Sequence, residues 1–234
     1  YALLAAAAGP RPRRRLVLGA AAAGLGLVSV SLAVAPAGAW WSWLNDIVAT
    51  SSLTSLPPGH SSIAAPWNRS IPGLVARFFV PNKFTEPVLE SPAAASLIAT
   101  ALILAVGAVT AWLLVRSMRN AGRTTIDHDL ELSLLAVGVF LISPASWTHH
   151  LVMLLPAALV VLRDNVLSPA EPLGGRLTAA LVLAVVALTL DDLIPRELRV
   201  SSQAIMSLMT VAVIGLWLLL AQHLRRRIRA RGID

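Results

Sequence analysis

Apolar residues in this chain occur in long runs that alternate with polar stretches. Six such runs are present, at residues 16–35, 93–115, 130–142, 151–162, 177–190 and 201–221. An α-helix needs roughly 20 apolar residues to cross the hydrocarbon core of a bilayer, and three of the runs reach that length. The pattern predicts an all-α, polytopic membrane bundle of about six transmembrane helices, with residues 1–234 forming a single domain.

The stretch 36–92, between the first two runs, differs in character. It contains Trp40, Trp41, Trp43 and Trp67, and seven prolines lie between residues 57 and 92. Prolines and serines favour turns, whereas tryptophans concentrate where a membrane meets water. We therefore predict an extended loop outside the membrane that its tryptophans anchor at the interface.

A second interruption lies between two short apolar runs. Residues 143–151 read Ser-Pro-Ala-Ser-Trp-Thr-His-His-Leu. A proline and adjacent histidines are poor helix formers, so we expect a helix break at a membrane surface or a polar cavity, where protein or water satisfies the freed backbone groups. The helix before the break either takes in polar residues such as Asp127 and Glu131 or ends inside such a cavity.

Composition supports a membrane protein. The chain is 56% hydrophobic and 13% charged, and its mean hydropathy is +0.73, which is unlike a soluble domain. It contains no cysteine, so neither disulfides nor thiolate metal sites are expected. Because the chain starts at Tyr1 rather than methionine, we expect a fragment; Arg11–Arg15 and the following run could instead form a signal peptide, but that run is long enough to be a retained helix.

Basic residues divide unevenly between the two sides of the predicted bundle. Fourteen of the 19 Lys and Arg residues fall on the side of both termini, whereas the 12 acidic residues divide evenly. Cytoplasmic loops are enriched in Lys and Arg, so we predict a multi-pass plasma-membrane protein with both termini cytoplasmic and the histidine pair outside. The terminal arginines fit anionic membrane lipids, and nucleic acid is not an expected partner.

His149 and His150 are the only adjacent histidines. A neutral imidazole accepts a proton near neutral pH, and polar residues at membrane depth are functional candidates. We therefore consider both residues catalytic. The alternative is that they cap a helix start at the interface, with Trp147 anchored among headgroups. Adjacent helical positions point about 100° apart and no cysteine joins them, which argues against a metal site.

Asn68, Arg69 and Ser70 begin a second polar motif, Asn-Arg-Ser-Ile-Pro-Gly, which Arg77 follows. An amide and a guanidinium outside the membrane could hold a sugar hydroxyl or a phosphate. The alternative is a proline-rich surface loop with a solvated arginine. The first three residues also fit the N-glycosylation pattern, which we discount because the Ala- and Arg-rich composition is typical of bacteria.

The two polar motifs carry a resemblance to one enzyme family. Ser-Pro-Ala-Ser-Trp-Thr-His-His at 143–150 resembles the "SPxSWxHH" signature of the polyprenol-phosphate-mannose-dependent mannosyltransferases of glycosyltransferase family 87. Asn-Arg-Ser-Ile-Pro-Gly with Arg77 is similar to that family's "NQSLxG" loop and following arginine, with Arg69 in place of the usual glutamine. The likeness covers residues 28–162; the last two helices match only in character.

The resemblance implies a C-type glycosyltransferase that takes mannose from a polyprenyl-phosphate donor and passes it to a lipid or glycan acceptor, without a cofactor. It implies catalytic roles for His149 and His150. Substrate-binding residues would be Asn68, Arg69, Ser70, Arg77, Ser146 and Trp147. Such enzymes place a catalytic aspartate in their first outward loop, so the chain would be a C-terminal portion, inactive by itself.

Two other functions remain open. A transporter or flippase-like protein could use the broken helix at Pro144 and the histidines as a substrate or proton site. A structural membrane subunit would have no site at all.

Overall fold

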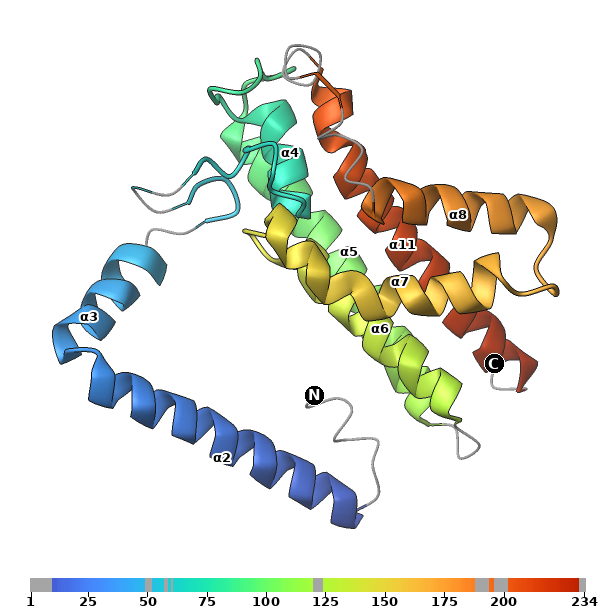
Figure 1. The fold of residues 1–234 in the computed structure, drawn as a ribbon. Coiled ribbons are helices and arrows are strands. Elements are labelled where there is room, and N and C mark those ends of the chain that lie inside the picture. The colour runs from blue at the N-terminus through green and yellow to red at the C-terminus, as the bar shows by residue number, and fades with distance from the viewer. Residues whose placement is uncertain are drawn as a thin grey trace. The chain divides into compact units, whose positions relative to one another are not determined.

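The computed structural model describes residues 10–48, 52–56, 59, 61–119, 124–187, 194–195 and 202–231 (Figure 1). Helices and loops make up these residues, and no β-strand occurs among them. The chain divides into two compact units, Tyr1–Ser51 with Leu56–His60, and Ser52–Ser55 with Ser61–Asp234. The prediction of an all-helical protein is therefore confirmed for the described residues.

The first unit contains the helix predicted at 16–35 and a second helical segment after it. Helix α2 spans Pro10–Val34, and α3 (Ala37–Ser42) continues as a wide π-helical segment, η1 (Trp43–Val48). The direction changes by 113° between the two parts. Pro36, whose ring fixes φ at −60°, separates them. Trp40, Trp41 and Trp43 thus lie on a helix, and the expectation of an extended loop was wrong for this segment.

Three long helices run through the second unit: α5 (Pro92–Met118), α6 (Thr125–Ile142) and α11 (Gln203–Ala230). Ser91 and Ser202 cap the first turns of α5 and α11, where each hydroxyl accepts a backbone N–H, as favoured N-cap residues do. The apolar core lies where α6 packs on α11. It contains Leu134, Val137, Leu141, Val213, Leu216 and Leu220, all fully buried.

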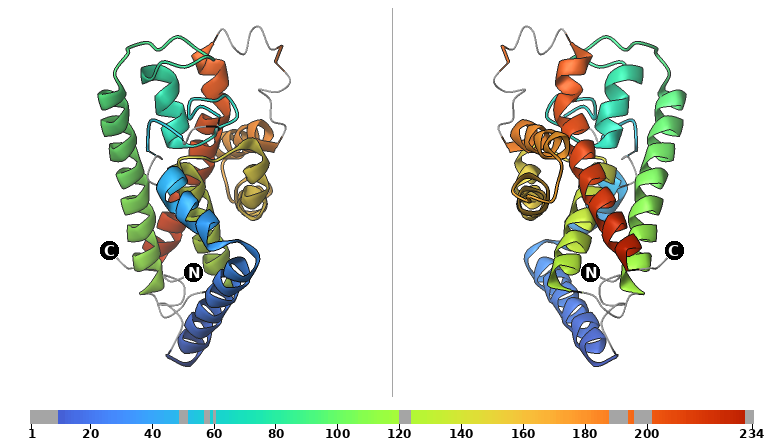
Figure 2. Two further views of the ribbon diagram at one scale, coloured as in Figure 1. Left: turned by 90° about the vertical axis from the view of Figure 1, so that its left-hand side faces the viewer. Right: turned by 90° about the vertical axis from the view of Figure 1, so that its right-hand side faces the viewer.

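A helical hairpin crosses these long helices. Its first arm consists of η2 (Thr148–Leu154), α7 (Leu155–Val161) and η3 (Leu162–Val166), and its second arm is α8 (Leu173–Ala187). Figure 2 shows α7 and α8 nearly end-on in views where α5 and α11 are seen along their length. The predicted helix break is confirmed: residues 143–147 are not helical and separate α6 from the first arm, and His149 and His150 lie in the first turn of η2.

Fewer helices than expected are long and apolar enough to cross a membrane. Among the described residues there are three, Pro92–Met118, Thr148–Val166 and Gln203–Ala230, or four if the bent segments of the first unit form one span. Helix α8 is shorter, at 15 residues, and α6 carries three acidic residues near its start. By length and composition the described residues thus provide three to four candidate spans, which suggests a membrane-associated protein, and the prediction of six spans is not confirmed.

Several helix boundaries differ from the predicted ones; α2 begins at Pro10 rather than 16, and α8 begins at Leu173 rather than 177. Helix α6 begins at Thr125, five residues early, and takes in Asp127 and Glu131, because the Asp127 carboxylate accepts hydrogen bonds from the Thr124 N–H and hydroxyl, a capping box. Helix α11 continues to Ala230 rather than ending at 221. A helix that was not predicted, α4 (Ile71–Phe79), lies within the 36–92 stretch. The predicted end of the fifth apolar run, residues 188–190, and the polar residues 191–193 after it lie outside the described residues.

One end of the second unit is closed by ion pairs. Asp127, fully buried at the start of α6, accepts hydrogen bonds from Arg227 at 2.7 Å and Arg231 at 2.7 Å, both at the end of α11. We call these three residues the arginine–aspartate cluster. Two further pairs, Arg163 with Asp129 and Arg226 with Glu171, fasten the hairpin to the same end.

Candidate functional site

The two polar motifs, 76 residues apart in the chain, meet in the fold. An isolated β-bridge joins Asn68 to Trp147, and the Arg69 N–H donates to the Ser146 carbonyl at 2.6 Å. We call residues 67–70 and 144–148 together the motif junction. The structure therefore places side by side the two motifs in which all the candidate site residues except Arg77 lie.

The side chain of Asn68 holds this junction together. Its amide nitrogen donates to the carbonyls of Ile63 at 2.9 Å and Pro144 at 3.0 Å. Its amide oxygen accepts from the backbone of Ser146 at 3.2 Å, and from both the N–H and the hydroxyl of Ser70. The residue is 2% exposed. All five contacts are internal, so Asn68 links one motif to the other.

Ser70 and Ser146 are buried beside Asn68 and fix the backbone on either side. The Ser70 hydroxyl accepts from the Gly73 N–H at 3.1 Å and so caps the N-terminus of α4. The Ser146 hydroxyl donates to the Phe140 carbonyl at 2.5 Å, in the last turn of α6. A buried polar group needs such partners, because each one left unsatisfied costs about 1–3 kcal/mol. The two serines therefore anchor the junction to α4 and α6.

Arg77 lies in the interior, fully buried on α4. Its guanidinium donates to the carbonyls of Ala65 and Asn68 at 3.2 and 3.0 Å, and to the hydroxyls of Ser207 and Thr210 on α11. These bonds fasten the junction to α11. Arg69 is also buried, at 1% exposure, so neither arginine is the solvated side chain that the surface-loop alternative expected.

The histidine pair lies at the surface of the junction. His149 is exposed and His150 is half-buried, and their rings meet edge to face with centroids 4.2 Å apart. Trp147 lies next to His149, with 6.2 Å between ring centroids. Adjacent positions on an α-helix point about 100° apart, yet these two imidazole rings lie together and form one patch of four ring nitrogens.

The two histidines have different hydrogen-bonding states. The Trp147 N–H donates to His150 Nδ1 at 3.2 Å, so a neutral His150 carries its hydrogen on Nε2 and donates from there. His150 thereby caps the start of η2, as the helix-capping alternative expected of the pair. Among the described residues none hydrogen-bonds to the His149 ring, and its nitrogens are open to a ligand.

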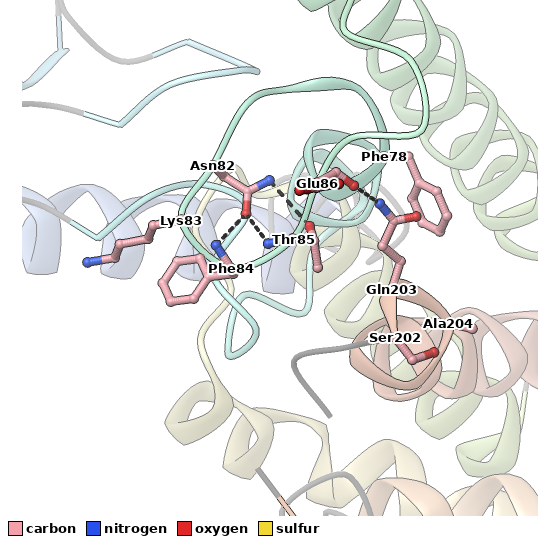
Figure 3. A pocket seen from close by; sticks show the side chains of 9 residues that line it. All are labelled: Phe78, Asn82, Lys83, Phe84, Thr85, Glu86, Ser202, Gln203 and Ala204. Atoms are coloured by element: carbon pink, nitrogen blue, oxygen red, sulfur yellow. Dashed lines mark hydrogen bonds between the residues drawn. The ribbon is translucent and has the colours of Figure 1, made fainter. Parts of the chain in front are cut away.

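A polar pocket adjoins the junction through aromatic contacts. The Thr148 hydroxyl donates to the Trp67 carbonyl, and the Trp67 ring packs edge-on against Phe84 at 5.3 Å. Phe84 lines a pocket of 720 Å³ between the 82–86 loop and the N-terminus of α11 (Figure 3). Its lining combines the rings of Phe78 and Phe84 with hydroxyl, amide and charged groups, from Asn82, Lys83, Thr85, Glu86, Ser202 and Gln203.

An apolar groove begins at the junction residue Thr148. It has a volume of 640 Å³ and runs between the two arms of the hairpin, from Thr148 and Leu151 to Val166 and Ala187. Apart from Thr148 its lining side chains are aliphatic, with leucines, valines and alanines from α7 and α8. The junction therefore borders an apolar groove at Thr148 and contacts a lining residue of the polar pocket through Trp67, an arrangement that suits an amphipathic ligand.

The described part of the chain contains no group of three or more His, Asp or Glu side chains that could hold a metal ion. The sequence did not lead us to Thr148, Trp67, Phe84 or the groove. Trp67, directly before Asn68, was read only as an interfacial anchor. Protein-family models, curated proteins and solved structures yield no match to this chain.

Proposed function

We propose that this chain forms part of a membrane glycosyltransferase, which moves mannose or another hexose from a polyprenyl-phosphate donor to a lipid or glycan acceptor on the outer face of the plasma membrane. The observation that carries the proposal is the meeting of the two motifs, through the Asn68 side chain, at the head of an apolar groove. The likeness of those motifs to family 87 supplies the reaction.

The open ring of His149 suits a general base. In the proposed step the acceptor hydroxyl gives its proton to His149 while its oxygen forms a bond to the anomeric carbon of the donor sugar. The bond from that carbon to the phosphate oxygen breaks, and its electron pair leaves with the lipid phosphate. A base must lie within hydrogen-bond reach of the proton it removes, and the exposed ring of His149 is accessible to an acceptor hydroxyl.

His150 suits a different role. Its Nδ1 accepts the Trp147 N–H, so its Nε2–H is left to donate to an oxygen of the departing phosphate. A donor aimed at developing negative charge stabilises a transition state. This division sharpens the sequence-based expectation, which left open which histidine is the base and which contacts the phosphate.

The other candidate residues act on this site through the backbone. Asn68, Ser70 and Ser146 fix the 144–148 segment, and Arg77 fixes the Asn68 carbonyl; we regard these as positioning residues. The apolar groove would hold the polyprenyl chain, and the polar pocket offers aromatic and hydroxyl groups to a sugar. The family resemblance implies a further catalytic aspartate in a first outward loop, so activity is tested with the complete reading frame.

Product analysis tests the proposal against transport. Membranes that contain the complete protein are given radiolabelled polyprenyl-phosphate-mannose, and extracted lipids and glycans are examined for a new mannosylated product. We expect a product whose formation depends on this protein. Accumulation of donor inside sealed vesicles without any covalent product would instead support a transporter. If active membranes show neither a product nor accumulation, a structural subunit is favoured.

A further inference from the structure

The last turns of α5 and α11 enclose a small, strongly basic pocket. Its volume is 90 Å³. Three of its six lining residues are arginines, and the full lining is Trp112, Leu113, Arg116, Arg225, Ile228 and Arg229. The Ser91 N–H at the start of α5 donates to the Phe79 carbonyl at the end of α4, so the final turn of α5 lies at the opposite end of the bundle from the motif junction. Figure 2 shows this end of α5 beside the end of α11.

The arginines at the end of α11 divide into two groups by helical position. Arg226 bonds to Glu171, and both Arg227 and Arg231 bond to Asp127. Arg225 and Arg229, four residues apart and thus on one helical face, line the pocket instead. Among the residues that the structure describes, no acidic side chain pairs with Arg225, Arg229 or Arg116. The pocket therefore gathers three positive charges that nothing in the described chain neutralises.

Arg116 is held in place by an aromatic ring. Its guanidinium lies 5.0 Å from the centroid of Trp112, one helical turn earlier on α5. Such cation–π contacts are worth about 0.5–1 kcal/mol at exposed sites, and they leave the N–H groups of the guanidinium free to donate. The contact orients one of the three donors before a ligand arrives.

The size and charge of the pocket select the ligand. At about 30 Å³ per water molecule, the 90 Å³ pocket holds about three waters, which matches the size of one phosphate group. Arginine binds phosphate oxygens through two parallel N–H bonds. Three arginines without an acidic neighbour thus favour a phosphate over a neutral ligand.

The surface next to the pocket indicates what carries the phosphate. Val109 and Trp112 on α5, and Val211 and Leu218 on α11, are exposed at 39, 44, 54 and 45%. Leu218 and Val211 lie seven and fourteen residues before Arg225, on the same helical face. Apolar side chains therefore lead from the pocket along both helices, as acyl chains attached to a bound phosphate would require.

We propose that this pocket, formed by Arg116, Arg225 and Arg229 over Trp112, binds the phosphate of an anionic phospholipid whose acyl chains lie along α5 and α11. Tryptophan and arginine at helix ends are typical of the membrane interface, and basic pockets between transmembrane helices bind lipid headgroups. Lipid binding at this end of the bundle requires no sugar transfer, so it can be tested independently of the proposed function.

Native mass spectrometry of the protein released from nanodiscs tests the site. With equal amounts of phosphatidylglycerol and phosphatidylcholine, we expect one phosphatidylglycerol to be retained, and the triple variant Arg116→Gln, Arg225→Gln, Arg229→Gln to retain at least 10-fold less. Arg119→Gln is the matched control, because Arg119 is a nearby exposed arginine outside the pocket; it should retain the lipid. Unchanged helicity and thermal unfolding confirm that each variant is folded.

Three results would overturn the proposal. Equal retention of phosphatidylcholine would show that charge does not select the lipid. Full retention by the triple Gln variant would remove these arginines from the site. Displacement of the lipid by millimolar inorganic phosphate would show that a free anion, not a lipid, is the ligand. A triple Arg→Lys variant keeps the charge but loses the paired N–H bonds, and we expect it to lose most of the selectivity.

Discussion

The motif junction and the arginine–aspartate cluster each join segments that are distant in sequence through one buried polar side chain, Asn68 in the first and Asp127 in the second. They use different forces. At the junction, neutral groups bond to one another: the Asn68 amide, two serine hydroxyls and backbone carbonyls. At the cluster, one carboxylate meets two guanidinium groups. Charge-assisted hydrogen bonds are about twice as strong as neutral ones.

This difference indicates that the junction positions a backbone segment, whereas the cluster holds two helix ends together. A network of five amide contacts fixes the direction of a backbone segment without placing a carboxylate beside the histidines. The ion pairs hold the ends of α6 and α11 together where no chemistry is proposed. We therefore expect substitutions at the junction to reduce activity beyond their effect on stability, and substitutions at the cluster to reduce stability alone.

Asp127→Asn should produce the largest loss of stability. The change removes the negative partner of Arg227 and Arg231, and removal of one partner of a buried ion pair costs about 3–5 kcal/mol. We expect about 3 kcal/mol, because both arginines are partly exposed and can reach water. Thermal unfolding in detergent measures this loss.

Asp129→Asn is the matched control for that change. Asp129 pairs with Arg163 where both side chains are more than a third exposed, and such pairs contribute about 0–1 kcal/mol. Equal losses in the two variants would refute the distinction between a buried and an exposed pair.

Asn68→Ala tests the junction. It removes five hydrogen bonds, and we expect a stability loss of about 2–3 kcal/mol because several partners remain buried and unsatisfied. Sugar transfer per folded molecule should fall roughly 100-fold, the effect of misplacing a reacting group by about 1 Å. Transfer that falls only in proportion to the folded fraction would contradict the positioning role.

Gly73→Ala strains the same junction without removing a polar group. A Cβ at this position would lie 2.7 Å from the Asn68 side-chain carbon, and overpacking of this kind costs about 1–3 kcal/mol. Gly107→Ala is the control, since a Cβ there meets nothing within 4 Å; helix propensity predicts no loss. Similar melting temperatures for both variants would indicate that Asn68 is free to move.

Leaving the control variants aside, Trp217→Phe should have the smallest effect. The Trp217 indole donates to the Thr110 hydroxyl at 3.0 Å, and one neutral hydrogen bond contributes about 1 kcal/mol. A double-mutant cycle with Thr110→Val isolates that bond. Zero coupling energy in unfolding experiments would show that the bond does not stabilise the packing of α5 on α11.

Much of the helical pattern could be predicted from the sequence, because continuous apolar runs and proline breaks are local signals. Helix α4 was missed although Ser70 followed by Pro72 is a helix start signal; the prolines and serines of the surrounding stretch favoured a loop. The end of α11 was placed too early because arginines end an apolar run without ending a helix. Its charged last turns are helical because Asp127 and Glu171 bind them.

The candidate site could be predicted as two motifs but not as one network. The sequence marks Asn68 and the histidines as unusual, yet only the fold places the Asn68 amide against the Pro144 carbonyl. Arg77 was expected at a substrate and lies against Ser207 and Thr210, residues 130 and 133 positions away. Contacts across such separations leave no local signal in a single sequence.

The most direct test of the account is the transfer rate of the His149→Ala, His150→Ala double variant in the complete protein. Membranes with equal amounts of folded wild-type and variant protein receive polyprenyl-phosphate-mannose, and the labelled product is measured over time. We predict that mannose transfer is abolished while the protein level and melting temperature are retained. Normal turnover in the double variant would remove the histidines from the mechanism.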